Sequence, residues 1–462
     1  ASIFASNIGS EHLIGLAGAG ASSGMAMAHW EIQGWMILIL GWVFVPFYTR
    51  SMVYTMPEFL ERRYNPQSRT ILSVISLVSY VLTKVAVTVY AGGLVFQQVF
   101  GIKELWGIDF FWIAAIGLVV LTALYTIFGG MKSVLYTSVL QTPILLLGSL
   151  IILVLGFKEL GGWDEMMRVC GAVTVNDYGD TMTNLIRSND DANFPWLGAL
   201  IGSAIIGFWY WCTDQFIVQR VLSGKNEMEA RRGTIFGAYL KLLPVFLFLI
   251  PGMIAFALHQ KYIGAGGEGF LPMLANGTAN ADAAFPTLVA KLLPAGVKGL
   301  VVCGILAALM SSLASLFNSS AMLFTIDFYK RFKPETPEKK LVGIGQIATI
   351  VIVVLGILWI PIMRSVGDVL YTYLQDVQSV LAPGIAAAFL LGICWKRTSA
   401  QGGMWGLISG MVIGLTRLGA KVYYSNAGEV ADSTFKYLFY DMNWLFFCGW
   451  MFLFCIIVVI VV

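Results

Sequence analysis

Four ionisable side chains lie inside long apolar stretches of this 462-residue chain, where an isolated charge is costly and therefore points to a function. They are Glu31, Lys84, Lys241 and Asp376. Lys241 lies about two helical turns beyond Arg232, too deep for its ammonium group to reach solvent easily, so we expect it to bind a ligand or a carboxylate. Glu31 lies near the end of its stretch, and solvation of its carboxylate is an equally good explanation. A direct role for Lys84 or Asp376 is the weaker prediction.

Hydroxyl side chains in another apolar stretch could bind a hard cation. Small and hydroxyl residues recur there at positions i, i+3, i+4 and i+7, which share one face of a helix. They are Ala308, Ser311, Ser312 and Ser315. Close helix packing is the ordinary explanation of such a run. If broken backbone carbonyls lay beside this face, however, its uncharged oxygens would suit Na⁺ better than a divalent ion, which requires several carboxylates.

Two apolar stretches contain the polar residues and glycines that interrupt helices. The first is 5–12 (ASNIGSEH), and the second is 202–215, where Gly207 precedes the aromatic run FWYW and then CTDQ. Inside a membrane, irregular backbone occurs only where protein or a water-filled cavity replaces the lost hydrogen bonds. Five predicted spans separate the two stretches. That spacing is typical of two inverted five-helix repeats whose first helices are interrupted near the bilayer midplane.

The composition places these stretches in a membrane. The chain is 58% hydrophobic and 12% charged, and with its 49 glycines roughly 69% of it is apolar or glycine, against about 45–50% in a soluble domain. An ordinary soluble enzyme is therefore excluded. The net charge of +3 is small for this length, so we expect no nucleic-acid partner.

Apolar runs of about 20 residues, the length that crosses a bilayer, predict about twelve helices. They lie near 1–24, 31–49, 70–100, 108–128, 133–157, 195–222, 233–257, 293–328, 341–364, 367–394, 402–424 and 443–462. The runs do not alternate as barrel strands do, so the predicted fold is an all-α integral membrane protein. We expect one transmembrane domain, with a first repeat at about 1–157, a second at about 195–394 and additional helices at about 402–462.

Basic residues predict the orientation of these helices. Lys and Arg cluster in the connections after even-numbered spans, which the positive-inside rule places in the cytoplasm. The clusters include Arg62, Arg63, Arg69, Arg220, Lys225, Arg231, Arg232, Lys330, Arg331, Lys333, Lys339, Lys340, Lys396 and Arg397. The long connections 158–194 and 258–290 are then outside. The chain starts at Ala1 and stops within an apolar run, so we expect further residues at both ends.

Other kinds of site find little support in the sequence. The six cysteines are scattered without metal-like spacing and are interpreted as apolar fillers. With three histidines and no HExxH motif, a zinc or haem site is not expected. No nucleophile–base pair lies at midplane depth, so a membrane enzyme is the least favoured class.

Six motifs together resemble one family, although each alone would be weak evidence. They are 6–10 (SNIGS), 54–60 (YTMPEFL), 125–133 (YTIFGGMKS), 209–215 (WYWCTDQ), 311–315 (SSLAS) and 324–327 (FTID). In this order they resemble the solute–sodium symporter family, most closely its sodium/glucose (sodium/galactose) cotransporter branch, over essentially the whole chain. The resemblance implies an inverted-repeat fold and Na⁺-driven uptake of a neutral monosaccharide by alternating access across the cell membrane, in a plasma or bacterial inner membrane.

The resemblance also implies positions for both sites. The sugar contacts fall on Asn7, His12, Glu31, Tyr80, Trp211, Lys241 and Gln375, with Tyr210 as the aromatic inner gate. The Na⁺ ligands fall on backbone carbonyls of Ala5, Ile8 and Ala308 and on the hydroxyls of Ser311 and Ser312. This donor set suits a sugar, because ionised Glu31 only accepts hydrogen bonds, Lys241 only donates them, and amides do both. Aromatic rings would cover the apolar face of the sugar.

Three departures from the branch pattern qualify the resemblance. Ser138 replaces a usual aspartate, and Ala314 stands where members that couple two sodium ions have threonine. Both changes remove cation ligands, so we expect one Na⁺ per sugar. The second span is also one residue short after Glu31, which leaves the alignment beyond that position open.

Several alternatives remain at this stage. The solute could be another polyol, such as myo-inositol, or a carboxylated solute, although a carboxylate would be better served by an arginine than by Lys241. From a different class, the chain could be a membrane sensor or channel with a transporter-like fold. The sequence does not predict an oligomeric state.

Overall fold

The computed structural model describes the backbone of all residues except 1, 10, 54, 275–276, 367–369 and 427–430. The side chains of these residues are also excluded, together with the side chains of residues 2, 5–6, 11, 125, 127–141, 362–366, 370–372 and 426. In this part of the chain, nine helical stretches are long and apolar enough to cross a membrane. They are His12–Ser51, Pro66–Phe100, Thr142–Leu160, Trp196–Thr213, Glu227–Gly264, Ala295–Phe332, Glu338–Pro361, Tyr373–Cys394 and Trp444–Val461. The predicted all-α membrane architecture is confirmed.

The predicted interruption of the first helix is present. Helix α1 (Ser2–Asn7) is followed by a π-helical segment, η1 (Glu11–Leu16), and by α2 (Ala17–Ser23). Between α1 and η1 the amide of Gly9 donates to the carbonyl of Asn7 at 3.0 Å, a bond that no α-helix makes. The regular helical ladder is therefore interrupted at residues 7–9, which are buried.

The second predicted interruption is also present. Helix α11 (Trp196–Gly207) widens into the π-helical segment η5 (Phe208–Thr213), the chain becomes extended at Asp214, and α12 (Gln215–Leu222) begins. The Asp214 carboxylate accepts from the amide of Phe216 at 3.1 Å, so it caps the new helix. The aromatic run thus ends at a break in the backbone.

Between these two interrupted helices the chain forms further helices and a small β-hairpin. The elements are η2 (Gly24–Met27), α3 (Ala28–Ile32), α4 (Trp35–Ile39), η3 (Leu40–Phe44), α5 (Val45–Ser51), α6 (Met56–Arg63), α7 (Pro66–Ser79), η4 (Tyr80–Val85), α8 (Ala86–Phe100), β1 (Glu104–Leu105), β2 (Ile108–Asp109), α9 (Phe110–Leu160) and α10 (Trp163–Gly171). Strands β1 and β2 pair in an antiparallel hairpin.

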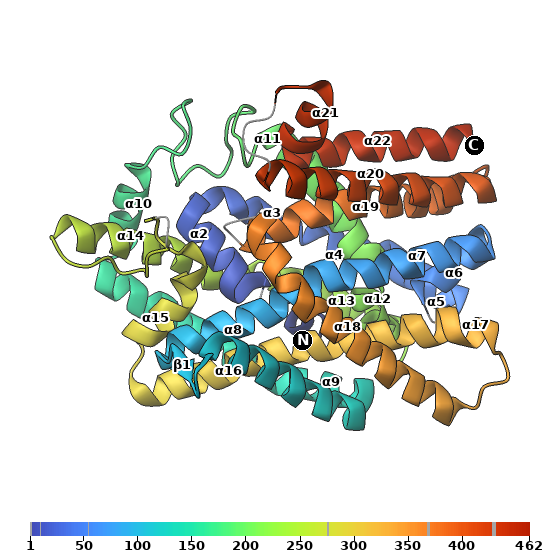
Figure 1. The fold of residues 1–462 in the computed structure, drawn as a ribbon, viewed down its shortest axis with the longest axis horizontal. Coiled ribbons are helices and arrows are strands. Elements are labelled where there is room, and N and C mark those ends of the chain that lie inside the picture. The colour runs from blue at the N-terminus through green and yellow to red at the C-terminus, as the bar shows by residue number, and fades with distance from the viewer. Residues whose placement is uncertain (1, 10, 54, 275–276, 367–369, 427–430) are drawn as a thin grey trace.

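The part after α12 continues in the same way. Its elements are α13 (Glu227–Leu240), η6 (Val245–Leu249), α14 (Ile250–Gly264), η7 (Ala281–Ala283), α15 (Ala284–Leu292), α16 (Ala295–Met322), η8 (Leu323–Tyr329), α17 (Lys330–Phe332), α18 (Glu338–Val366), α19 (Leu370–Cys394), α20 (Ala400–Asn426), α21 (Thr434–Lys436), η9 (Tyr437–Asp441) and α22 (Trp444–Val461). Helices α19, α20 and α22 lie side by side (Figure 1).

Helix α9 includes most of two predicted spans, 108–128 and 133–157. A Cβ on Gly92 would contact Leu118 and Leu309, and a Cβ on Gly304 would contact Ile144. Leu309 and Gly304 are close together on α16, whereas a straight helix would place residues 118 and 144 about 39 Å apart. The two ends of α9 therefore cross the bundle next to each other, as two separate spans would.

The long connections and the connections that contain the Lys and Arg clusters lie at opposite ends of the molecule. Figure 1 shows α10 and the end of α14 at one end of the long axis, and α6 and α17 at the other. The first end carries the connections predicted to be outside, and the second carries the arginine and lysine clusters. This separation agrees with the orientation predicted from charge.

Candidate binding site

A small, largely buried cavity lies where the interrupted helices meet α3, the end of α13 and α19. Its volume is about 20 Å³, which is room for about one water molecule. It is lined by Asn7, His12, Trp30, Glu31, Gln33, Ile206, Tyr210, Trp211, Lys241, Gln375 and Gln378. Seven of the eight side chains assigned to a sugar site by the resemblance therefore meet in one place. Any solute larger than water must displace or move these side chains.

A buried ion pair dominates the cavity. Lys241 Nζ lies 2.6 Å from Glu31 Oε2, donates to Asn7 Oδ1 at 2.6 Å and is 2.7 Å from His12 Nε2. Glu31 is fully buried, and Lys241 is 4% exposed. Buried charges persist in proteins when they are paired in this way. The prediction of a ligand or carboxylate partner for Lys241 is confirmed by Glu31, while the alternative that Glu31 is solvated at an interface is wrong.

Aromatic rings form one wall of the cavity. The side chain of Asn7 donates to Tyr210 Oη at 3.1 Å, which ties the first interrupted helix to the second. Tyr210 and Trp211 make an edge-to-face pair with ring centroids 4.9 Å apart. The ammonium group of Lys241 lies 5.6 Å from the Trp211 ring. The wall is thus held by both polar and cation–π contacts.

Tyr80 is absent from the described lining of the cavity and belongs to a second buried ion pair. Its hydroxyl donates to Asp214 Oδ1 at 2.8 Å, and Lys84 Nζ lies 2.6 Å from Asp214 Oδ2. The ammonium group is 4.0 Å from the Phe216 ring and 4.7 Å from the Tyr210 ring. Lys84, the weaker candidate from the sequence, therefore joins η4 to the break in the second interrupted helix.

Four of the lining residues were not predicted from the sequence: Trp30, Gln33, Ile206 and Gln378. Gln378 lies three positions after Gln375 and so on the same helical face, a signal that was available. For Gln33 the sequence offered only an indirect signal, the missing residue that the resemblance indicates after Glu31, because the direction of this side chain depends on a local change in the helix there.

Two carboxamide atoms at the cavity lack a hydrogen-bond partner among the described residues. They are Nε2 of Gln33 and Oε1 of Gln375, and both atoms are buried. Buried polar atoms in folded proteins are nearly always hydrogen-bonded. One donor and one acceptor are therefore available to a molecule that enters the cavity.

The residues assigned to a sodium site lie where the first interrupted helix meets α16. A Cβ on Gly9 would collide with Ser312 Oγ, so this hydroxyl lies directly against the irregular backbone beside Ile8. Ala308 and Ser311 are buried on the same face of α16. The side chains of Ala5 and Ser138 lie outside the described residues, but Ala5 was assigned only through its carbonyl.

Ser315, on the same face, has a different environment. Its hydroxyl donates to the carbonyl of Ser311 at 2.6 Å and accepts from the Arg220 guanidinium. Among the described residues, no group of three or more His, Cys, Asp or Glu side chains could hold a metal ion. The oxygens beside Gly9 are uncharged, which suits a monovalent cation.

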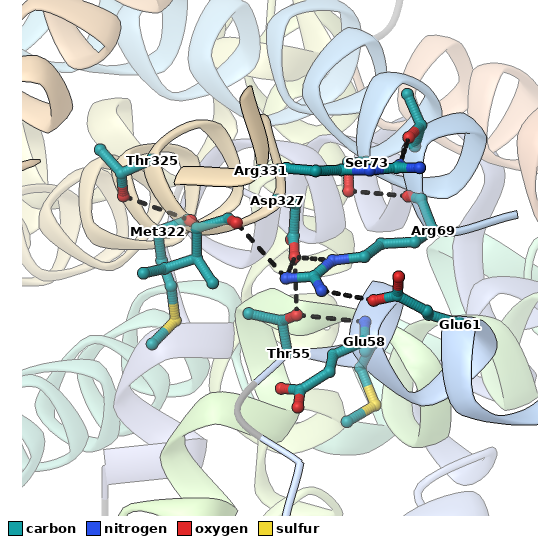
Figure 2. A network of polar contacts seen from close by, with 12 residues as sticks. Thr55, Glu58, Glu61, Arg69, Ser73, Met322, Thr325, Asp327 and Arg331 are labelled. Carbon is teal, nitrogen blue, oxygen red and sulfur yellow. Dashed lines mark hydrogen bonds and ion pairs between the residues drawn. The ribbon is translucent and has the colours of Figure 1, made fainter. Parts of the chain in front are cut away.

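Two of the family-like motifs, 54–60 and 324–327, meet away from the cavity. Figure 2 shows Arg69 between Glu61 and Asp327. The guanidinium nitrogens of Arg69 lie 2.5 Å from Glu61 Oε2 and 2.6 Å from Asp327 Oδ1. Thr55 donates to the same Asp327 oxygen at 3.1 Å. These contacts join α6, α7 and η8 at the end of the molecule that carries the basic clusters. Thr55 and Asp327 therefore give the two motifs a structural role, because their contact links the start of α6 to η8.

Asp376, the remaining ionisable candidate, forms a further ion-pair cluster. It pairs with Lys421, and Arg417 Nε lies 4.0 Å from its other oxygen. Arg417 also donates to the carbonyl of Met442 at 2.7 Å. Asp376 therefore links α19 to the additional helices, and it is absent from the described lining of the cavity.

Comparisons with known proteins agree with this architecture. The family model of the sodium:solute symporter family matches residues 1–410. Sodium/myo-inositol cotransporter 2 of Homo sapiens is 38% identical over 90% of the chain, which spans 63% of that relative's length. Sodium/glucose cotransporter 1 of Ovis aries is 38% identical over 100% of the chain and 71% of its own length.

Solved structures share the fold at low sequence identity. A Na⁺-coupled sialic acid symporter in a substrate-bound outward-open state has a TM-score of 0.74 at 21% identity, covering 100% of this chain and 87% of the other. A nucleobase-cation-symport-1 family transporter in a closed conformation has a TM-score of 0.52 at 14% identity, covering 99% and 90%. The fold consists of two inverted five-helix repeats with interrupted first helices, plus additional C-terminal helices. The chain is a multi-pass cell-membrane protein that belongs to the sodium:solute symporter family.

Proposed function

We propose that this protein couples the entry of Na⁺ to the import of a neutral monosaccharide, such as glucose or galactose, by alternating access. The observation that carries the proposal is the buried ion pair between Glu31 and Lys241 at the wall of the cavity. Because the two charges neutralise each other, a neutral solute can enter without leaving a buried charge unpaired. A charged solute would have to break this pair to find a partner.

The donors and acceptors around the cavity suit a ring of hydroxyl groups. A hydroxyl both donates and accepts, so it can bind to Glu31 and Lys241 at once or to the carboxamides of Asn7 and Gln375. The proposed solute contacts are Asn7, His12, Glu31, Trp211, Lys241 and Gln375, with Tyr210 as the inner gate. Tyr80 acts indirectly, through Asp214. The rings of Tyr210 and Trp211 would cover the apolar face of the sugar.

Sodium would bind where α1 meets α16. The proposed ligands are the carbonyl oxygens of Ala5, Ile8 and Ala308 and the hydroxyls of Ser311 and Ser312. The close approach of Ser312 to Gly9 supports this assignment. Because Asn7 at the same break bonds to both Lys241 and Tyr210, an ion there would be coupled to the solute cavity through one residue.

A second candidate solute is myo-inositol, which the relatives at 38–39% identity favour as much as glucose. It is also a neutral ring of hydroxyls, so the same ion pair admits it. A carboxylated solute is disfavoured, because it would compete with Glu31 for Lys241. We further propose that the repeats comprise about 1–157 and 195–394, with additional helices at 402–462.

Uptake into proteoliposomes tests the proposal. Full-length protein is reconstituted, and labelled glucose, galactose and myo-inositol are added with an inward Na⁺ gradient or with choline in place of Na⁺. We expect concentrative uptake of at least one of them only with Na⁺, and its loss in Lys241→Gln. The control is Lys421→Gln, which removes a lysine that lies outside the cavity. Equal uptake with and without Na⁺, or no uptake of any polyol, would overturn the proposal and favour a channel or sensor.

A further inference from the structure

The helix that carries Glu31 is interrupted two residues later. Helix α3 ends at Ile32, α4 begins at Trp35, and Gln33 and Gly34 form a turn between them. The amides of Gly34 and Met36 donate to carbonyls only three residues earlier, at 3.1 and 2.9 Å. The chain is therefore wound more tightly here than in an α-helix. The interruption falls where the second span is one residue short.

This interruption changes the direction of Gln33. In a regular α-helix, residues two positions apart point about 200° apart around the axis, so Gln33 would point away from the face of Glu31. In the structure both side chains line the same cavity. The tightened turn therefore adds a carboxamide to the site that an uninterrupted helix would direct elsewhere.

The opposing helix leaves space for this carboxamide. Gly207, the last residue of α11, faces Gln33, and a Cβ at this position would collide with Gln33 Oε1 and lie 3.2 Å from Met36 Cγ. Gln33 is 4% exposed, and its Nε2 has no hydrogen-bond partner among the described residues. The pairing of glutamine with glycine thus holds an unpartnered amide at the wall of the cavity.

We propose that Gln33 determines which polyol this site accepts, by donating a hydrogen bond to one solute hydroxyl. This inference rests on the proposed function and deepens it. Glu31 and Lys241 form an ion pair at 2.6 Å, so the loss of one solute hydroxyl leaves their two charges paired. The Nε2 amide of Gln33 has no other hydrogen-bond partner among the residues that the structure describes, so a solute that lacks the matching hydroxyl leaves it buried and unsatisfied. A site that is built to bind a hydroxyl discriminates most strongly against analogues that lack it.

Deoxy analogues test this role. The transported solute and its monodeoxy analogues are compared as competitors of labelled uptake in proteoliposomes. In the wild-type protein we expect one analogue to bind about tenfold or more weakly than the parent. Gln33→Leu, which keeps the size of the side chain, is expected to bind this analogue and the parent equally, and to keep its discrimination against the others. The matched control is Gln346→Leu on α18, outside the described lining of this cavity, which should preserve the wild-type pattern.

A double-mutant cycle tests the same contact from the opposing helix. Gly207→Ala places a methyl group against Gln33 Oε1, and we expect it to weaken solute binding severalfold. In a Gln33→Ala background the methyl group meets no carboxamide, and only the contact with the flexible Met36 side chain remains. The same change is therefore expected to have a much smaller effect on solute binding. Equal effects of Gly207→Ala in both backgrounds would show that Gln33 does not carry the loss.

The outcomes separate this inference from the function on which it rests. If the wild-type protein transports no polyol, the proposed function fails. If it transports one and Gln33→Leu retains discrimination against every deoxy analogue, only the role of Gln33 is overturned. Solute-induced shifts of the thermal unfolding temperature show in each variant whether the protein is folded and binds.

Discussion

Lys241 and Glu31, from helices far apart in the sequence, form an ion pair of 2.6 Å inside a cavity with room for about one water molecule. The pair has two consequences. It links α3 to the end of α13, and its two charges offset each other inside the cavity. A solute with hydroxyl groups can therefore be accommodated by inserting between partners that are already present.

Removal of Lys241 should affect both stability and transport. Lys241→Met leaves the Glu31 carboxylate buried without a cation, and we expect a loss of about 3–5 kcal/mol in unfolding free energy together with loss of uptake. The double variant Lys241→Met/Glu31→Gln removes both charges, so it should recover much of the stability but not the uptake. Thermal unfolding and labelled uptake of the purified variants measure the two effects. Unchanged solute affinity in the single variant would remove Lys241 from the site.

Loss of the Ser312 hydroxyl should weaken sodium and solute together. We expect Ser312→Ala to require more Na⁺ for half-maximal uptake and to bind solute less tightly at fixed Na⁺. Linkage is reciprocal, so an ion that favours the solute-binding state is itself favoured by solute. Ser379→Ala is the control, because this buried hydroxyl bonds to the carbonyl of Asp376 on α19. Normal Na⁺ activation in Ser312→Ala would place the ion elsewhere.

The ion count is expected to be one Na⁺ per solute. A second site would need a carboxylate or a full shell of oxygens, and the positions that would supply it by resemblance are Ser138 and Ala314. Ala314 has no side-chain oxygen, and the side chain of Ser138 lies outside the described residues. One charge moved across 100 mV contributes about 2.3 kcal/mol, so the count determines how steeply solute can be concentrated. Reversal potentials at set gradients measure it, and a ratio near two would contradict this prediction.

The ion pair between Lys84 and Asp214 should be needed for stability. Lys84→Met leaves the Asp214 carboxylate buried beside aromatic rings, and we expect a loss of about 3–5 kcal/mol in unfolding free energy. The control is Arg62→Ala, which breaks an exposed pair with Glu58 and should change stability by less than about 1 kcal/mol. Chemical unfolding of both variants provides the comparison. Similarly small losses of unfolding free energy in both variants would show that the buried ion pair is not needed for stability.

The sequence alone was sufficient for the class of protein and for the two interrupted helices. Runs of apolar residues predict spans because a bilayer admits little else. Residues 5–12 and 202–215 predict interruptions because polar side chains and glycines occur there within apolar runs. These are local properties, and each can be evaluated without knowing what packs against it.

The tertiary structure decided which side chains meet. It paired Glu31 with Lys241 instead of with solvent, and it directed Tyr80 to Asp214 instead of to the cavity. Gln33 entered the wall because a tightened turn follows Glu31 and because Gly207 faces it. Such contacts depend on how distant helices pack and on small rotations about their axes, and neither is recorded in the local pattern of residues. The sequence by itself therefore determined the membrane fold and the two interruptions at 5–12 and 202–215. The packing of the helices determined which polar atoms are satisfied and which remain available to a solute.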